Sequence, residues 1–226
     1  MKICALIPAY NEEETVGMII KETKKYIDAV FVINNGSTDR TAAVASEHGA
    51  IVINYDAKRG YGAAQYAGQQ HVIAQGYDYI LQLDADGQHD PNYIPQFLKL
   101  VHEDDFDLII GSRFRSANRI YVSFMRKMGI IFFSTVISIL GTTRLTDVTS
   151  GFKVYKASSL TKLTKPSDIN PAIEQIMEIT KKGMKIKEIS IVMPNRITGN
   201  THLNGFRFSV YPFRATWHII KVLLFK

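Results

Sequence analysis

Short apolar runs alternate with amphipathic segments through the first half of the chain, and this alternation most constrains the fold. Each run has four or five residues, which suits a buried strand, and each intervening segment is long enough for a helix. The strands are expected at residues 3–7, 29–33, 51–54, 79–83 and 108–111. This order is typical of an α/β fold in which helices cover both faces of a mostly parallel sheet.

The intervening helices carry end signals of their own. Asn11 is expected to cap a helix over residues 11–26, whose first turn holds three glutamates and whose end is rich in lysine. Pro91 suits the first position of another helix. Two further helices are expected at residues 40–48 and from the glycine turn at 59–62 to about residue 75.

The pattern changes after residue 113. We expect one domain over residues 1–204 and a C-terminal amphipathic segment over residues 205–226, packed on that domain or on a membrane. The elements expected in this half are a basic, aromatic-rich helix at 121–140, strands at 152–155 and 186–193, and helices at 171–182 and 213–225.

Clusters of polar residues follow the ends of the five early strands. In an open parallel sheet, ligands bind outside the carboxyl ends of the strands. The sequence therefore predicts one ligand site at that edge. The clusters lie at residues 8–12, 34–39, 59–62, 84–89 and 111–113.

The charge of the chain is unevenly distributed. The net charge is +6, yet residues 108–146 and 189–226 contain no acidic residue and hold eleven of the 27 lysines and arginines. Two basic segments beside an acidic remainder predict an anionic partner: a phosphate, a lipid head group or nucleic acid. No nucleic-acid-binding motif is present, so we expect no nucleic acid partner.

Cysteine content and apolar run length indicate the cellular setting. Cys4 is the only cysteine, so no intramolecular disulfide can form, and a cytosolic chain is the simplest interpretation. No uncharged apolar run reaches about 18 residues, so no membrane-spanning helix is expected. The basic segments are rich in phenylalanine and other large apolar residues, however. They predict peripheral contact with the inner face of a membrane, against the alternative that they are ordinary core and rim.

Asp84 and Asp86 follow a buried strand and form the strongest chemical signal. Alternation along an extended chain points both carboxylates the same way, about 7 Å apart, and Gln88 continues the spacing. Carboxylate and amide oxygens suit Mg²⁺ or Mn²⁺. The alternative is a solvated turn in which the aspartates cap a helix.

Residues 83–89 (LDADGQH) resemble the metal motif of family 2 inverting glycosyltransferases, which share the GT-A fold. The resemblance is greatest to the branch that transfers mannose or glucose to dolichol or polyprenol phosphate. Six motifs match in order over roughly residues 3–202, and together they are specific where one alone would be weak. The other five lie at residues 7–12, 33–39, 59–63, 111–113 and 147–153.

The resemblance implies a set of roles for this chain. Metal ligation falls to Asp84, Asp86 and Gln88, and catalysis to Asp86, Asp147 and Arg113. Acceptor binding falls to Arg113, Arg126, Ser150, Arg196 and His202. The residues implied in binding the nucleotide sugar are Pro8, Tyr10, Asn11, Glu12, Asn34, Asn35, Ser37, Gly60, Gly62, Asp84 and Ala85.

The chain departs from the family pattern at three positions. The family usually has an aspartate at the position of Asn34, and often at the position of Asn35, and that acid binds the base. Asparagine can donate and accept hydrogen bonds, so the choice of base is open. His202 stands where the lipid-carrier branch has lysine, and an imidazole is a weaker phosphate partner near neutral pH.

Several side chains have alternative roles. Asp147 could act as a general base toward a sugar hydroxyl, orient a phosphate acceptor, or cap its own loop. His89 is expected to cap the turn rather than bind metal. Glu174 could face the acceptor or lie on a helix surface, and Tyr10 and Tyr61 could stack on the base or simply pack.

These observations predict an enzyme that moves a hexose from a UDP- or GDP-linked sugar to polyprenyl phosphate. One alternative is the same transfer to a hydroxyl of a growing cell-surface glycan, in which case Asp147 or another acid must take the proton. An alternative from another class is a protein that binds a nucleotide sugar without catalysis. The intact set of Asp84, Asp86 and Gln88 argues against the last.

Overall fold

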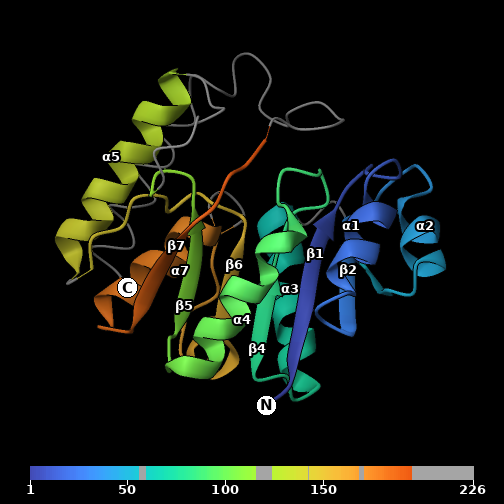
Figure 1. Ribbon diagram of the computed structural model, residues 1–226, viewed down its shortest axis with the longest axis horizontal. Coiled ribbons are helices and arrows are strands. Elements are labelled where there is room, and N and C mark those ends of the chain that lie inside the picture. Colours follow the sequence, from blue (N-terminus) through green and yellow to red (C-terminus); the bar gives the residue numbers. More distant parts are fainter. Residues whose placement is uncertain (56–59, 116–123, 142, 168–170, 195–226) are drawn as a thin grey trace.

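A computed structural model describes residues 1–55, 60–115, 124–141, 143–167 and 171–194. Its centre is a seven-stranded sheet in the order β3-β2-β1-β4-β6-β5-β7. Neighbouring strands are parallel except at β6, which runs antiparallel to both β4 and β5 (Figure 1). The strands are β1 (Ile3–Ala9), β2 (Ala29–Asn34), β3 (Ile51–Asn54), β4 (Tyr79–Gln82), β5 (Leu108–Ser112), β6 (Lys153–Lys156) and β7 (Ile186–Ser190).

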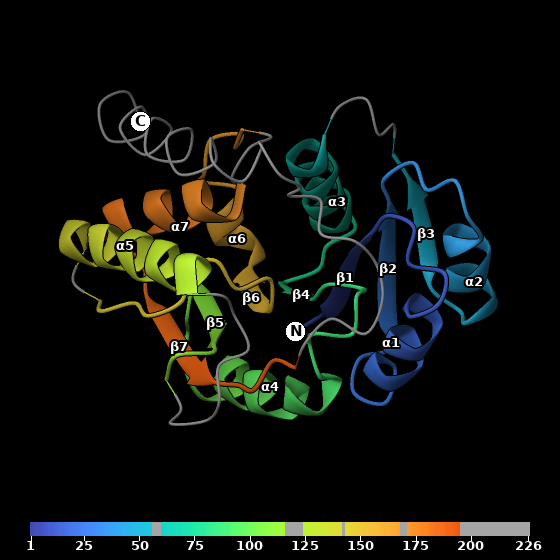
Figure 2. The same cartoon turned by 90° about the horizontal axis from the view of Figure 1, so that it is seen from above.

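Helices cover both faces of the sheet, as expected. Figure 2 shows α3, α5, α6 and α7 on one face and α1 and α4 on the other. The α-helices are α1 (Val16–Thr23), α2 (Thr41–Glu47), α3 (Tyr61–Ala74), α4 (Ile94–Glu103), α5 (Phe124–Leu140), α6 (Ala157–Leu160) and α7 (Pro171–Lys181), and a short 3₁₀ helix, η2 (Pro91–Tyr93), precedes α4.

Strand β1 shows why the early strands read as continuous apolar runs. Cys4 and Leu6 belong to the core under α3 and α7, whereas Ala5 and Ile7 belong to the core under α1 and α4. A strand covered on both faces needs apolar residues at every position. Cys4 is fully buried, and burial raises the pKa of its thiol to about 12, so it acts as a small core side chain.

The five early strands lie where the sequence predicts them, but the start of the first helix was predicted wrongly. Helix α1 begins at Val16, so Asn11 does not cap it and no glutamate lies in its first turn. Asn11 adopts a left-handed conformation with φ of 53°. Its backbone N–H donates to Ser37 Oγ and its side chain accepts from Thr38, so contacts with a distant loop replace the local cap.

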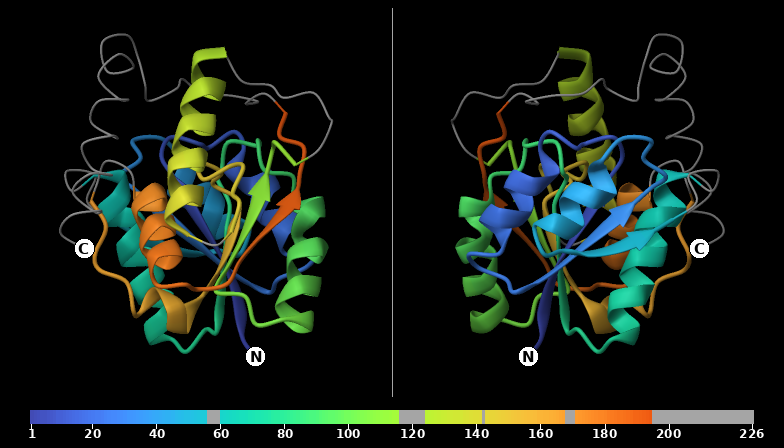
Figure 3. Two further views of the ribbon diagram at one scale, coloured as in Figure 1. Left: turned by 90° about the vertical axis from the view of Figure 1, so that its left-hand side faces the viewer. Right: turned by 90° about the vertical axis from the view of Figure 1, so that its right-hand side faces the viewer.

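Parts of the second half remain predictions. The helix expected at 213–225 and the segment 205–226 lie outside the described residues. Within the described ranges, no helix is both long enough and apolar enough to cross a membrane. Helix α5 extends past the carboxyl ends of the strands (Figures 1 and 3).

Candidate active site

The carboxyl edge of the sheet gathers the predicted polar clusters. The loops after β1, β2, β4 and β5 all leave the sheet there (Figure 1). Because β6 is antiparallel, the loop at residues 147–151 that precedes it reaches the same edge. Segments from these five strands therefore meet at one edge, where the sequence predicts four of them, and the loop before β6 joins them because its strand is antiparallel.

The loops after β1 and β2 are bonded to each other. Asn11 Oδ1 accepts from the Thr38 backbone N–H at 2.8 Å, and the Asn11 N–H donates to Ser37 Oγ at 3.1 Å. The Glu12 N–H donates to Thr41 Oγ1 at 2.8 Å. The two loops thus form one ordered wall at the end of the sheet that the sequence assigns to the nucleotide.

The two asparagines after β2 differ in their use. The Asn34 side chain is buried and serves the loop, because its Oδ1 accepts from the Ser37 N–H at 3.1 Å and its Nδ2 donates to Asn54 Oδ1 at 2.8 Å. Asn35 Oδ1 is buried without a hydrogen-bond partner in the described part of the chain. A buried carbonyl oxygen without a donor is costly, so Asn35 is the better candidate to accept an N–H from a ligand.

The remaining positions assigned to the nucleotide sugar lie along the same edge. Pro8 pairs with Ile33 near the end of β1, and Tyr10 beyond it is 38% exposed. Gly60 has φ of 85°, a conformation that favours glycine, and α3 starts directly after it with Gly62 buried in its first turn. Their binding roles stay predictions.

The two aspartates after β4 have different environments. Asp86 is 3% exposed, and its Oδ1 accepts from the Gln88 N–H at 3.0 Å, whereas the Asp84 side chain is 35% exposed. Gly87, with φ of 78°, forms the turn between Asp86 and Gln88. Ala85 between the two carboxylates is buried and holds the turn in the core.

This donor set fits a hard divalent cation. Two carboxylates and the Gln88 amide are oxygen ligands of the kind that Mg²⁺ and Mn²⁺ prefer. Gln88 Nε2 donates to the Pro194 carbonyl at 3.1 Å, so the bond fixes the amide and leaves its oxygen for a ligand. Nowhere among the described residues do three histidine, cysteine or acidic side chains lie close enough together to hold a metal ion. Phosphate oxygens and water would therefore supply the remaining ligands of a cation at Asp84, Asp86 and Gln88.

His89 caps the turn, as the sequence predicts. Its Nδ1 accepts from the Asp84 backbone N–H at 2.8 Å, and its ring stacks on Phe152 with centroids 5.3 Å apart. Burial lowers the pKa of the ring, which favours the neutral form with the proton on Nε2. His89 therefore fixes the backbone from which the Asp84 side chain extends.

Arg113 and Asp147, two residues to which the sequence gives acceptor and catalytic roles, form a buried forked pair. Arg113 Nε donates to Asp147 Oδ2 at 2.6 Å and Nη2 donates to Oδ1 at 2.7 Å. The Arg113 backbone N–H adds a bond to Oδ2 at 3.1 Å, and Asp147 is fully buried. Both carboxylate oxygens are thus engaged, and the pair fixes the orientation of the guanidinium plane.

The other predicted acceptor residues are not all gathered here. Ser150 is buried, and its Oγ accepts from the Phe152 N–H at 3.2 Å, so it shapes the loop. Arg126 lies on the exposed first turn of α5. Arg196 and His202 lie outside the described residues, and their roles stay predictions.

The surface position considered for Glu174 is wrong. Its side chain is 5% exposed and accepts from the Ser167 N–H at 3.0 Å. Helix α7 packs against α3 and α5, and Glu174 is buried on it, so the acid lies inside the molecule rather than on its surface.

Sequence reasoning missed Lys153, which is fully buried on β6. Its register partners are Gln82 on β4 and Ile110 on β5, and its Nζ has no hydrogen-bond partner in the described part of the chain. Burial lowers the pKa of the ammonium to about 8, although the negative charges of Asp147 and Asp84 oppose that shift. The signal in the sequence is a lysine between the apolar residues Phe152 and Val154 of an expected strand.

Replacing Lys153 by methionine should stabilise the protein at pH 7. The difference in stability between the variant and the wild type should become smaller as the pH rises. The folded-state pKa of about 8 lies below the ordinary 10.5, so the unfolded chain binds more protons between these values and wild-type stability rises there. Lys153→Met lacks this rise. Melting curves in EDTA from pH 7.5 to 9.5 should show the difference in Tm shrinking, and a constant difference would contradict the assigned burial cost.

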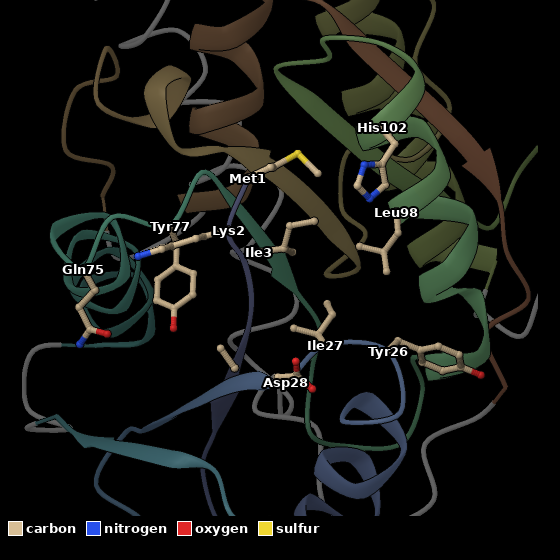
Figure 4. Close-up of a pocket in the computed structure, with 11 residues that line it drawn as sticks. Met1, Lys2, Ile3, Tyr26, Ile27, Asp28, Gln75, Tyr77, Leu98 and His102 are labelled. Atoms are coloured by element: carbon tan, nitrogen blue, oxygen red, sulfur yellow. The ribbon is translucent and has the colours of Figure 1, made fainter.

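A separate hollow of about 490 Å³ lies at the opposite edge of the sheet. Figure 4 shows Met1, Ile3, Ile27 and Leu98 around it, with Lys2 and His102 nearby. These residues stand at the amino ends of the strands and on α4. The hollow is therefore distinct from the edge at which Asp84, Asp86 and Arg113 lie.

A mostly parallel sheet with two carboxylates, an interlocked loop pair and a fixed arginine at its carboxyl edge is the architecture of a GT-A glycosyltransferase. Residues 4–164 match the family described as glycosyl transferase family 2. That match spans well over half of the chain, which therefore belongs to glycosyl transferase family 2, and the protein is an enzyme of that class.

Two curated relatives and one solved structure agree with this assignment. The chain is 27% identical to the undecaprenyl-phosphate mannosyltransferase of Micrococcus luteus, over 91% of this chain and 88% of the relative. It is 27% identical to the dolichyl-phosphate hexose transferase of Haloferax volcanii, over 90% and 87%. Glucosyl-3-phosphoglycerate synthase from Mycobacterium tuberculosis, in complex with Mn²⁺, UDP-glucose and phosphoglyceric acid, has a TM-score of 0.74 at 16% identity and covers 98% of this chain and 79% of its own. The expected GT-A fold is confirmed.

Proposed function

We propose that this enzyme transfers a hexose from a nucleotide diphosphate sugar to polyprenyl phosphate, with inversion at the anomeric carbon and with a divalent cation. The forked pair of Arg113 and Asp147 is the observation that carries the proposal. It offers an oriented guanidinium for an anionic acceptor and leaves Asp147 poorly suited to take a proton from a hydroxyl. The named activities of the two relatives support the same acceptor class.

The donor would lie across the two halves of the edge. Its base would contact the wall formed by the loops after β1 and β2, where Asn35 Oδ1 can accept an N–H. Asp84, Asp86 and Gln88 would hold the cation beside the diphosphate, and the complex of the structural relative with Mn²⁺ and UDP-glucose supports this arrangement. When bound, the cation neutralises charge that builds on the departing diphosphate.

The acceptor phosphate would approach from the side of Arg113. One of its oxygens forms a bond to the anomeric carbon as the bond from that carbon to the diphosphate oxygen breaks, so the configuration inverts. A phosphate oxygen is already an anion and needs no general base. With a sugar hydroxyl as acceptor, Asp147 would have to leave Arg113 to accept the proton, which makes that alternative the second candidate.

A pair of acceptors that differ only in the phosphate tests this choice. Purified enzyme with Mn²⁺ is given radiolabelled UDP-glucose, UDP-N-acetylglucosamine, UDP-galactose or GDP-mannose, together with farnesyl phosphate or farnesol. Sugar on farnesyl phosphate alone supports the proposal and identifies the donor. Transfer to glycan hydroxyls but to neither lipid would instead favour the second candidate.

Helix α5 offers a surface for the membrane in which such a lipid resides. Ile130, Phe133 and Ile137 are buried against the domain, yet a second apolar stripe on the same helix is exposed. A helix that is apolar on both sides needs a partner on each. Its exposed stripe consists of Phe124, Met125, Met128, Ile131, Phe132 and Ile139, with Arg126 and Lys127 also exposed.

Met128→Asp should weaken binding to vesicles that contain phosphatidylglycerol about tenfold. Met128 is 49% exposed on α5, and the change removes apolar area that the membrane would bury and adds a negative charge that anionic lipid repels. Met18→Asp is the matched control, because Met18 is 47% exposed on α1. Vesicle sedimentation measures both, and equal effects of the two variants would contradict a membrane role for α5.

A further inference from the structure

Glu188 on β7 lies against the loop that carries Asp147. Its side chain is 4% exposed, and one oxygen, Oε1, accepts from the backbone N–H groups of Thr146 at 2.8 Å and Asp147 at 2.9 Å. The other oxygen, Oε2, accepts from Thr146 Oγ1 at 2.8 Å. Three hydrogen bonds to one buried carboxylate fix the backbone on which Asp147 stands.

A continuous set of contacts leads from Glu188 to Arg113. Glu188 accepts from the Asp147 backbone N–H, and the Asp147 carboxylate accepts from Arg113 Nε at 2.6 Å and from Nη2 at 2.7 Å. A second link runs through Thr146 Oγ1, which lies 2.6 Å from Ser112 Oγ at the end of β5. Contacts thus connect the Arg113 guanidinium to a residue on a different strand, β7.

Arg115 meets the same carboxylate. Its Nη1 lies 3.7 Å from Glu188 Oε2, while its side chain is 48% exposed. Asp147 and Glu188 are the acids that border the two acid-free stretches of the sequence. Each of the two arginines that follow β5 thus meets an acid from the edge of one of those stretches.

We propose that Glu188 is a positioning residue for the acceptor side, which it serves by orienting Arg113 through Asp147. The inference rests on the proposed function, in which Arg113 contacts the acceptor phosphate. A carboxylate suits this position because two backbone N–H groups and the Thr146 hydroxyl donate to it, and Arg115 faces it with the opposite charge. In glutamine the amide oxygen can keep the two backbone bonds, but the NH₂ group then replaces Oε2. Thr146 Oγ1 would have to accept from that group instead of donating, which changes its contact with Ser112, and Arg115 would lose the negative charge that it faces.

Glu178 on α7 provides a matched control. Its side chain is 5% exposed, against 4% for Glu188, and it accepts from the Thr164 N–H at 3.0 and 3.1 Å and from Thr164 Oγ1 at 2.9 Å. Thr164 follows α6, which begins where β6 ends at the amino edge of the sheet. Glu178→Gln therefore removes a comparable buried carboxylate away from the candidate site.

The direct test is the Nε–H resonance of Arg113 in proton–nitrogen NMR spectra of the full chain, assigned with Arg113→Lys. In the wild type the forked bond to Asp147 should slow exchange of the Nε proton with water and shift its resonance away from that of a solvent-exposed arginine. Glu188→Gln should move the resonance back toward the solvent-exposed value, whereas Glu178→Gln should leave it in place. An unchanged signal in a folded Glu188→Gln protein would overturn the inference, whatever the acceptor is.

Kinetics with farnesyl phosphate add a second readout. Glu188→Gln should raise the KM for this acceptor at least tenfold and leave the donor affinity within twofold, and Glu178→Gln should change neither. Equal losses for donor and acceptor would indicate a merely structural role. If the wild type does not use farnesyl phosphate, the proposed function fails while the NMR result still decides the role of Glu188.

A milder variant covers the case in which Glu188→Gln does not fold. Thr146→Val removes one of the three bonds to Glu188 and the contact with Ser112. It should shift the Arg113 Nε–H signal in the same direction by a smaller amount. No shift in the folded Thr146→Val protein would also overturn the inference.

Discussion

Replacing Asp86 by asparagine is expected to lower kcat/KM for sugar transfer about a thousandfold, which corresponds to about 4 kcal/mol of transition-state stabilisation. Asparagine has nearly the same volume, and its Oδ1 can still accept from the Gln88 N–H, so the turn should persist. What is lost is the negative charge toward a divalent cation. Initial rates give the activity, and Mn²⁺ titration followed by paramagnetic resonance gives the cation affinity.

Asp90→Asn is the control for this change. Asp90 lies four residues later and caps η2 by accepting from the Asn92 N–H at 2.9 Å, a bond that asparagine can also make. We expect near wild-type turnover and cation affinity for it. Asp86→Asn with normal Mn²⁺ affinity and turnover would show that this pair of carboxylates is a structural turn rather than a metal site.

Gly151→Ala is expected to lower activity at least a hundredfold and to weaken the cation affinity, although residue 151 is not a proposed ligand. A Cβ at this position would clash with Asp84 Oδ2 and lie 2.7 Å from His89 Cε1. His89 is held by its bond to the Asp84 N–H and by its stack on Phe152, so it cannot withdraw easily. Displacements of about 1 Å at a reacting centre can cost about a hundredfold in rate.

Gly129→Ala separates this effect from a general cost of replacing glycine. Gly129 lies within α5, and a Cβ there meets nothing within 4 Å. Alanine should stabilise the helix by about 0.5–1 kcal/mol and leave turnover unchanged. Thermal melts and initial rates of both variants give the comparison, and full activity of Gly151→Ala would refute the assigned position of Asp84.

The local features of the fold were predictable because periodicity and strand-end polarity are local properties. β1 through β5 and the helices between them follow from apolar runs and turn residues. The insertion of antiparallel β6 between β4 and β5 was not predictable, since strand order depends on pairing between distant segments. That insertion is what brings the loop before β6 to the carboxyl edge.

The sequence predicts candidate residues for the site but not the contacts between them. The spacing of Asp84, Asp86 and Gln88 predicts a metal site, and the motif order predicts roles for Arg113 and Asp147. Nothing local indicates that the last two, 34 residues apart, form a buried pair. Asn11 shows the opposite failure, because its capping signal is local but its bond to Thr38, 27 residues away, determines its conformation.

The most direct test of the proposed function is the structure of the product. Enzyme, Mn²⁺, farnesyl phosphate and the active nucleotide sugar labelled with carbon-13 at C1 are followed by NMR. We predict a β-linked hexosyl phosphate whose C1 couples to phosphorus, formed with Mn²⁺ and absent in EDTA. An α-linked product, or the same product formed at an unchanged rate in EDTA, would contradict metal-dependent inverting transfer to a lipid phosphate.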